Sequence, residues 1–312
     1  MNAIDTRELS KEYRKFLSFK KFVAVDEVNL QVPTGSIFGF LGLNGAGKTS
    51  TIKMLLGLSY PTSGSGSVLG HPMGDIRTKE KIGFLPEEAY FQRHLTAYDF
   101  LNFCAKTLHI ERAVRKDKIY EMLELVNMKG KEKMKLSEFS KGMLQRIGVA
   151  QALLNNPDLA IFDEPLTGLD PVGRSELKEI MQSLQENGKT VFFSSHILSD
   201  VQAICDHVGI MNHGRLIYQG GIDDLVNISS YKIRIEELPA SHLDRIENIV
   251  DGMSKSDGQW VLEANTEEKK AEISAYLKKN NLKESNIEVS YSELEPVFIE
   301  KIKKDNEERN IS

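Results

Sequence analysis

Short apolar runs alternate, over the first two thirds of the chain, with segments whose apolar residues recur at helical spacing. Residues 95–155 show helical spacing, and so do residues 175–185. The apolar or alternating runs predict strands at 25–32, 37–41, 159–162, 191–193 and a hairpin within 208–218. Strands that alternate with helices indicate an α/β fold with a doubly wound, parallel sheet, into which residues 88–156 insert a helical lobe.

The pattern changes after Gly220-Gly221, where we place a domain boundary, so that residues 1–222 and 223–312 form separate domains. The second segment predicts the order β-α-β-β-α-β, with strands at 231–236, before and after a turn at 256–258, and at 287–291, and with helices at 243–249 and 268–279. This is the order of a small α+β domain of the split βαβ, ferredoxin-like kind. A last helix is expected from Ser292, with Glu295 completing a capping box.

Composition narrows the class of protein. The chain has 312 residues, of which 40% are apolar, a length and apolar content that favour about two globular domains. Its formal charge of −5 comes without a block of Lys and Arg, so we expect no nucleic-acid partner; the lysines at 269–279 predict a solvated helix face. Cys104 and Cys205 lack CxxC spacing and are expected to be buried, reduced thiols. Because no apolar run reaches the roughly 18 residues of a membrane span, a membrane role would need a partner.

The phosphate-binding pattern G-x-x-x-x-G-K-[ST] is complete at residues 42–49, between the predicted strand 37–41 and an apolar helical pattern. Its glycines allow backbone N–H groups to converge on an anion at a helix N-terminus. Lys48 can reach the β- and γ-phosphates, and the Thr49 hydroxyl can ligate Mg²⁺. A nucleoside triphosphate is therefore expected to bind Gly42, Leu43, Asn44, Gly45, Ala46, Gly47, Lys48, Thr49 and Ser50.

Two carboxylates follow the apolar strand 159–162. Ligands of open α/β sheets bind at the carboxyl ends of the strands, which is where Asp163 and Glu164 fall. Asp163 is expected to hold Mg²⁺, directly or through water, and Glu164 to polarise the attacking water as a general base.

Three further segments add candidate residues. Ser140 is a good N-cap for an apolar-faced helix, and its hydroxyl, with the N–H groups of Lys141 and Gly142, forms an anion site. His196 follows the strand 191–193 and could bridge a γ-phosphate and its attacking water. The loop 167–171 comes directly after Glu164-Pro165.

Taken in order, these segments resemble the nucleotide-binding subunit of an ATP-binding cassette (ABC) transporter over residues 4–222. Residues 42–49 match the Walker A loop, residues 159–163 resemble Walker B, and Glu164 stands at the catalytic carboxylate. FSKGM at 139–143 resembles the signature, residues 167–170 resemble the D-loop, and His196 resembles the switch histidine. The resemblance implies a mixed sheet with a parallel core, an antiparallel β subdomain and the helical lobe. It also implies that two copies pair head to tail, so that Ser140 and Gly142 of one would grip the γ-phosphate held by the Walker A loop of the other. Asp170 of the D-loop is also expected to be a nucleotide-binding residue.

The chain departs from the family pattern in three places. Glu87 stands where the family's Q-loop has glutamine; a carboxylate there still suits Mg²⁺ but adds negative charge. Lys141 and Met143 replace the usual glycine and glutamine of the signature, in a form similar to cassettes of ABC-2-type exporters. The aromatic that stacks on adenine is open: Tyr13 fits the local pattern best, with Phe16, Phe19 and Phe22 as alternatives.

The resemblance implies an ATPase that drives export through a separate transmembrane permease subunit, with ATP and Mg²⁺ as cofactors. The chain would then lie at the cytoplasmic face of the cell membrane and contact the permease through its helical lobe and residues 89–99. The alternative is a soluble ABC-type ATPase that acts on a macromolecular complex. The chain has neither the long heptad runs of the repair type nor the two cassettes of the translation factors.

Overall fold

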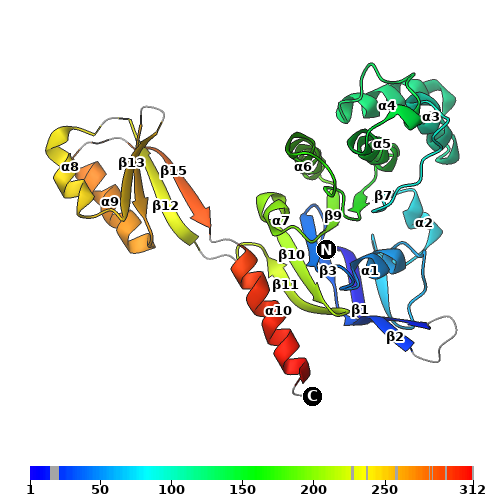
Figure 1. Ribbon diagram of the computed structural model, residues 1–312, viewed down its shortest axis with the longest axis horizontal. Coiled ribbons are helices and arrows are strands. Elements are labelled where there is room, and N and C mark those ends of the chain that lie inside the picture. The colour runs from blue at the N-terminus through cyan, green and yellow to red at the C-terminus, as the bar shows by residue number, and fades with distance from the viewer. Residues whose placement is uncertain are drawn as a thin grey trace. The chain divides into compact units, whose positions relative to one another are not determined.

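The computed structural model describes residues 1–14, 21–225, 228–236, 238–256, 259–280, 282, 284–291 and 294–310. The chain forms two compact units (Figure 1). The first comprises Met1–Ile222 together with Phe298–Ser312, and the second comprises Asp223–Val297.

A six-stranded sheet forms the centre of the first unit, in the order β11-β10-β4-β9-β8-β7. All neighbours are parallel except β11, which forms an antiparallel hairpin with β10. The strands are β4 (Ile37–Gly42), β7 (Ile82–Leu85), β8 (Leu159–Phe162), β9 (Thr190–Ser195), β10 (His207–Asn212) and β11 (Arg215–Gly221). Because β9 lies between β4 and β8, the sheet brings the carboxyl ends of three predicted strands together.

A second, antiparallel sheet has the order β2-β1-β5-β6, with β3 paired to β1. Its strands are β1 (Asn2–Arg14), β2 (Lys21–Val28), β3 (Gln31–Pro33), β5 (Ser63–Val68) and β6 (His71–Pro72). The mixed sheet and the antiparallel subdomain implied by the family resemblance are thus both present.

Helix α1 (Lys48–Leu55) contacts strands of both sheets and shares one core with them. All six residues of β4 are buried, as a strand covered on both faces requires. The rings of Phe38 and Phe192 stack 5.6 Å apart, and Phe40 lies 5.2 Å from Phe192. This packing fixes the end of β4, from which the phosphate-binding loop emerges.

The predicted helical lobe contains α3 (Ala97–Thr107), α4 (Arg112–Leu125), a 3₁₀ turn η1 (Leu136–Glu138) and α5 (Lys141–Leu153). The three α-helices pack on one another, and Figure 1 shows them grouped together. Thr96 caps α3 by accepting a hydrogen bond from the Asp99 N–H, and Ser140 caps α5 in the same way from Met143.

The remaining helices of the cassette are α2 (Ile76–Lys79), α6 (Pro171–Glu186) and α7 (Leu198–Ile204), of which α6 and α7 pack on β4 and β9. Buried Asp200 of α7 pairs with Arg174 and Lys178 of α6, at 2.5 and 2.7 Å. These ion pairs join two helices that follow the strands carrying Glu164 and His196.

Cys104 and Cys205 are free cysteines; Cys205 is buried, as expected, whereas Cys104 is only half-buried. Burial raises the pKa of Cys104 to about 11 and raises the pKa of the more deeply buried Cys205 as well. Among the described helices, none combines the length and the apolar character that a membrane crossing needs.

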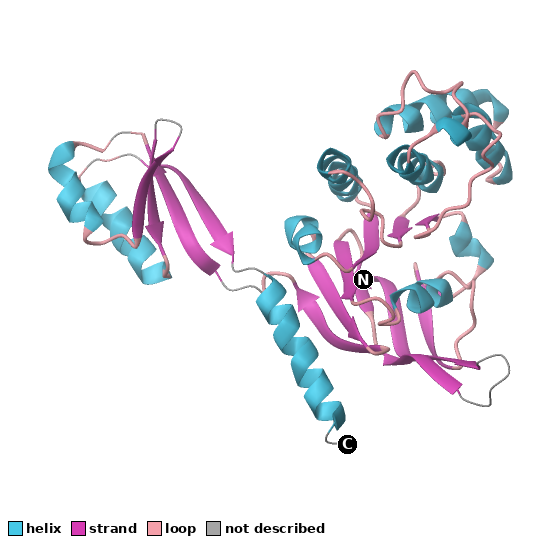
Figure 2. Cartoon of the chain, viewed as in Figure 1, coloured by secondary structure: helices cyan, strands magenta, loops and turns pink. Residues whose placement is uncertain are grey.

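The second unit has a four-stranded antiparallel sheet in the order β13-β14-β12-β15. Its elements are β12 (Ile228–Ile235), α8 (Ala240–Glu247), β13 (Gly252–Ser256), β14 (Gln259–Ala264), α9 (Glu267–Lys279) and β15 (Glu284–Tyr291). Ile246 of α8 and Ile273 of α9 join the same core as Ile233 and Leu262, so both helices cover one face of the sheet (Figure 2). This order agrees with the β-α-β-β-α-β pattern of the sequence, whose turn at 257–258 lies outside the described residues.

The last helix, α10 (Leu294–Asn310), corrects the predicted domain assignment. The sequence assigned residues 223–312 to one accessory domain, but Phe298–Ser312 group with the first unit. The reason is a set of polar contacts between α10 and the end of β10. The accessory unit is therefore inserted ahead of the final cassette helix. The predicted cap at Ser292 lies outside the described residues.

Candidate functional site

The phosphate-binding loop connects β4 to α1 and has the geometry that its glycines predict. Gly45 and Gly47 have φ values of +81° and +108°, a region that side chains other than glycine rarely adopt. A Cβ atom at Gly47 would also lie 2.4 Å from the Ala24 carbonyl oxygen. The loop turns tightly through Ala46 N–H, which donates to the Leu43 carbonyl at 3.0 Å.

An open cavity lies over this loop. It is lined by Phe22, Ala24, Glu87, Glu164 and the loop residues Leu43, Asn44, Gly45, Ala46, Gly47, Lys48, Thr49 and Ser50. The structure therefore brings eight of the nine predicted loop residues to one cavity. The ninth, Gly42, lies behind and gives its carbonyl oxygen to Lys48.

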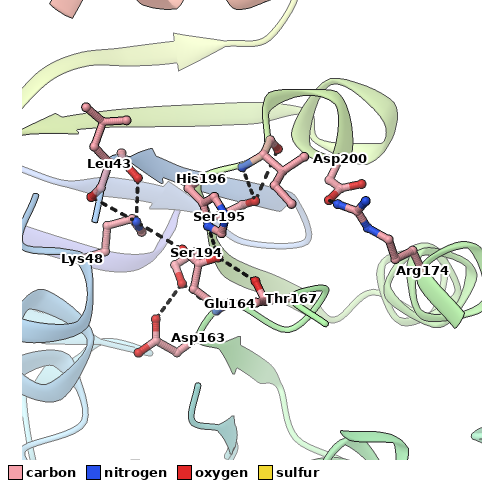
Figure 3. A network of polar contacts seen from close by, with 12 residues as sticks. Leu43, Lys48, Asp163, Glu164, Thr167, Arg174, Ser194, Ser195, His196 and Asp200 are labelled. Atoms are coloured by element: carbon pink, nitrogen blue, oxygen red, sulfur yellow. Dashed lines mark hydrogen bonds and ion pairs between the residues drawn. The ribbon is translucent and has the colours of Figure 1, made fainter. Parts of the chain in front are cut away.

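Lys48 is held at the floor of the cavity by two backbone carbonyls and one carboxylate. Its ammonium donates to the Gly42 and Leu43 carbonyls at 2.6 and 3.4 Å. It also pairs with the Glu164 carboxylate at 3.2 Å, and the two side chains are only 6% and 7% exposed. The predicted phosphate-binding cation and the predicted general base thus lie side by side (Figure 3), and both line the cavity.

The two oxygens of Glu164 have different surroundings. Oε2 accepts hydrogen bonds from Thr167 Oγ1 at 3.2 Å and from His196 Nδ1 at 2.8 Å. Because an ionised carboxylate can only accept, this contact assigns the proton to Nδ1 of His196. Oε1 accepts no hydrogen bond and is turned to the Lys48 ammonium. His196 does not line the cavity but contacts Glu164, which does.

Ser194 is a site residue to which the sequence analysis gave no role. Its hydroxyl donates to Asp163 Oδ1 at 2.6 Å and accepts from the Glu164 N–H at 2.8 Å. Glu164 has φ +50°, a strained value for a residue other than glycine, and this bond holds its backbone there. The sequence held a signal for this role, because Ser194 lies near the carboxyl end of β9, the strand that His196 follows.

The donors near the loop fit a magnesium ion. Thr49 and Glu87 line the cavity, and buried Asp163 precedes Glu164 at the end of β8. Within the described residues no group of three or more His, Cys, Asp or Glu side chains could hold a metal. Mg²⁺ usually takes one or two protein oxygens and completes its shell with water and phosphate, so a sparse donor set of this kind suits it.

Of the four aromatic candidates for base stacking, the structure describes Tyr13 and Phe22. Phe22, 53% exposed, lines the cavity with Ala24 on β2. Tyr13, the cross-strand partner of Phe22 on β1, does not line the cavity. Its ring instead lies under the ammonium of Lys11, 5.2 Å away. Phe16 and Phe19 lie outside the described residues.

The signature and D-loop residues lie away from this cavity within one chain. Ser140 is exposed and caps α5, and a Cβ atom at Gly142 would meet only the Leu169 side chain, at 3.5 Å. Asp170 caps α6 by accepting from the Gly173 N–H at 2.8 Å. None of the three lines the cavity.

We predict that Ser194→Ala lowers the rate of ATP hydrolysis by about tenfold. The change removes a donor to Asp163 and an acceptor for Glu164, each buried, and should also cost about 1–3 kcal/mol of unfolding free energy. Steady-state hydrolysis and urea unfolding measure the two effects. Ser195→Ala is the matched control, since Ser195 bonds only the Ile197 backbone; equal rate losses in both variants would refute the role of Ser194.

Comparison with known proteins gives the same family as the motifs. A family model described as "ABC transporter" matches residues 25–167. An uncharacterized ABC transporter ATP-binding protein of Synechocystis is 44% identical over 74% of this chain and 67% of its own length. The bacitracin transport ATP-binding protein of Enterococcus faecalis is 39% identical over 71% of this chain and 70% of its own. The lantibiotic transport ATP-binding protein of Streptococcus pyogenes is 37% identical over 68% of this chain and 90% of its own length.

Solved structures agree with the fold. The ATP-binding subunit of an ABC transporter aligns with a TM-score of 0.64 at 29% identity, over 72% of this chain and 91% of that one. A dimeric ATP-binding cassette bound to ADP and phosphate aligns with a TM-score of 0.64 over 70% of this chain and 98% of that one. Because the two sequences are only 22% identical, this likeness concerns the fold alone. The resemblance seen in the motifs is confirmed: the chain belongs to the ABC transporter family, as an ATP-binding, ATP-hydrolysing subunit.

Proposed function

We propose that this chain is the motor of an exporter: two copies bind and hydrolyse ATP and thereby drive a separate transmembrane protein. The observation that carries the proposal is the Lys48–Glu164 pair, which joins a phosphate-binding cation and a candidate base at 3.2 Å over one cavity. Relatives named for bacitracin transport, linearmycin resistance and lantibiotic transport support the assignment to export. The transported substrate would be selected by the membrane protein.

The residues divide the reaction between binding and proton transfer. The loop N–H groups and Lys48 hold the β- and γ-phosphates. Thr49 and Asp163, with Glu87 at the rim, would hold Mg²⁺, which neutralises phosphate charge when bound. Glu164 Oε1 accepts a proton from water as the water oxygen bonds to the γ-phosphorus and the bond from that phosphorus to the ADP oxygen breaks. Oε2 is already occupied by His196 and Thr167, so His196 fixes the orientation of the base.

A second copy supplies the part of the site that one chain lacks. Ser140 and Gly142 lie at the exposed N-terminus of α5, where free N–H groups attract an anion. They do not line the cavity of their own chain, so a γ-phosphate bound there would meet them only from a partner. Asp170 holds the loop between the Walker B segment and α6 in place.

The segment between β7 and α3 is the proposed contact with the membrane protein. Tyr90 is 88% exposed, whereas its neighbour Phe91 is buried and packs edge-on against Phe100 of α3, 5.4 Å away. Glu87 of the same segment lines the nucleotide cavity. One short stretch therefore links the cavity, the helical lobe and an exposed aromatic, and its partner would place the chain at the cytoplasmic face of the membrane.

Replacing the base should separate binding from hydrolysis. We expect Glu164→Gln to bind ATP, to accumulate as an ATP-dependent dimer, and to hydrolyse ATP about 100-fold more slowly. Light scattering with and without ATP and steady-state phosphate release measure these effects. Glu88→Gln is the matched control, because Glu88 is exposed and does not line the cavity; a Glu164→Gln enzyme with near-normal turnover would exclude Glu164 as the base.

Two aromatic neighbours provide a test of the base-stacking site. Phe22→Ala should weaken the binding of ATP by about 5- to 20-fold, because stacking on a base contributes about 1–3 kcal/mol. Tyr13→Ala, which truncates the cross-strand partner of Phe22, should leave affinity within about twofold. Titration with a fluorescent ATP analogue measures both. A larger loss at Tyr13 than at Phe22 would restore the assignment made from the sequence.

The proposed membrane contact can be broken without touching the nucleotide site. Tyr90→Glu should reduce recovery of the tagged chain with an integral membrane protein by about tenfold, because a buried interface disfavours an unpaired charge. Tyr60→Glu, at a residue 82% exposed elsewhere on the cassette, should not. Both variants should keep their ATP affinity. Failure of the unmodified chain to recover any membrane protein from detergent extracts would contradict the transporter assignment.

A further inference from the structure

Three hydrogen bonds join the last helix, α10, to a single residue at the end of β10. The Asn212 side-chain amide donates to Asp305 Oδ2 at 2.6 Å and to Asn306 Oδ1 at 3.0 Å. The Asn212 carbonyl accepts from Arg309 Nη2 at 3.4 Å. Asn212 is only 3% exposed, so these partners replace water for a buried polar group. One turn earlier, the Lys301 ammonium lies 4.4 Å from the ring centre of Tyr218 on β11.

The turn that follows Asn212 is bonded to the phosphate-binding loop. His213 and Gly214 have φ values of +44° and +87°, as in the tight hairpin turn with two left-handed residues. The Gly214 N–H donates to the Ala46 carbonyl at 2.9 Å, and the Gly214 carbonyl accepts from the Asp26 N–H at 2.8 Å. The Ala46 carbonyl is thereby directed to the turn, which leaves the loop's N–H groups to face an anion.

The phosphate-binding loop and the 213–214 turn are also closely packed against each other. Beyond its close approach to Ala24, a Cβ atom at Gly47 would lie 3.0 Å from Met211 Cε and 3.4 Å from Gly214 Cα. Met211 pairs in register with Gly42, the first residue of the loop. A shift of the end of β10 therefore displaces the loop at both its beginning and its middle.

We propose that α10 is a positioning element for nucleotide binding, in which Asp305 and Asn306 hold Asn212 and, through the 213–214 turn, pre-organise the phosphate-binding loop. This rests on the nucleotide site described above but not on the identity of any membrane partner. A loop held in its binding conformation pays less ordering entropy when phosphate arrives. Loss of the helix contact should thus appear as weaker nucleotide binding.

The test uses the full chain and the fluorescent ligand N-methylanthraniloyl-ADP. Asp305→Ala/Asn306→Ala removes both acceptors and should raise the dissociation constant by about three- to tenfold. The exchange Asp305→Asn/Asn306→Asp keeps an acceptor oxygen at each position and should restore binding to within about twofold. Glu307→Ala, on the exposed side of the same helix, removes the same charge as the double alanine variant and should bind normally.

Thermal unfolding of each variant separates positioning from simple destabilisation. A double alanine variant that loses stability but binds the ADP analogue normally would overturn the proposal, and so would equal losses in Glu307→Ala or no recovery in the exchange variant. Lys48→Ala marks complete loss of the site for comparison. If even the unmodified chain failed to bind the analogue, the nucleotide site itself would be refuted, a result distinct from failure of the helix contact.

Discussion

The buried pair of Lys48 and Glu164 is the interaction on which the site depends. Two opposite charges, each less than a tenth exposed, lie 3.2 Å apart at the floor of one cavity. Desolvating such a pair costs several kcal/mol per ion, and removing one partner typically costs about 3–5 kcal/mol, so the pair is weak evidence for stability and stronger evidence for reactivity. The surrounding contacts serve to fix its two members: loop carbonyls hold Lys48, whereas His196, Thr167 and Ser194 hold Glu164.

The sheet order explains how residues far apart in sequence meet. The strands β4, β9 and β8 are adjacent and parallel, so their carboxyl ends deliver the phosphate loop, His196 and Glu164 to one edge. Large aromatic side chains pack between β4 and β9 and help to fix the spacing of these two strands. The antiparallel sheet then brings Phe22 to the same cavity from the other side of the loop.

Much of this could be predicted, because the loop, the Walker B carboxylates and the helix cap are local patterns whose geometry follows from short-range chemistry. The features that could not be predicted depend on contacts between segments that are distant in the sequence. The local sequence pattern favours Tyr13 over Phe22 for base stacking, whereas the folded cavity is lined by Phe22 and not by Tyr13. The contacts of Ser194 with Asp163 and Glu164 could not be predicted, because they depend on the pairing of β8 with β9. The end of α10 was assigned to the accessory domain because its polar partners, near Asn212, lie in a hairpin about ninety residues earlier.

The central claim is that each ATP is held by the loop of one copy and the Ser140 helix of another. Mixing Lys48→Ala chains with Ser140→Ala chains tests it most directly, since each mixed dimer contains one site with both parts intact. The account predicts that the mixture hydrolyses ATP faster than the sum of the two variants measured separately. A mixture no faster than that sum, formed under conditions where mixed dimers are detected, would contradict it.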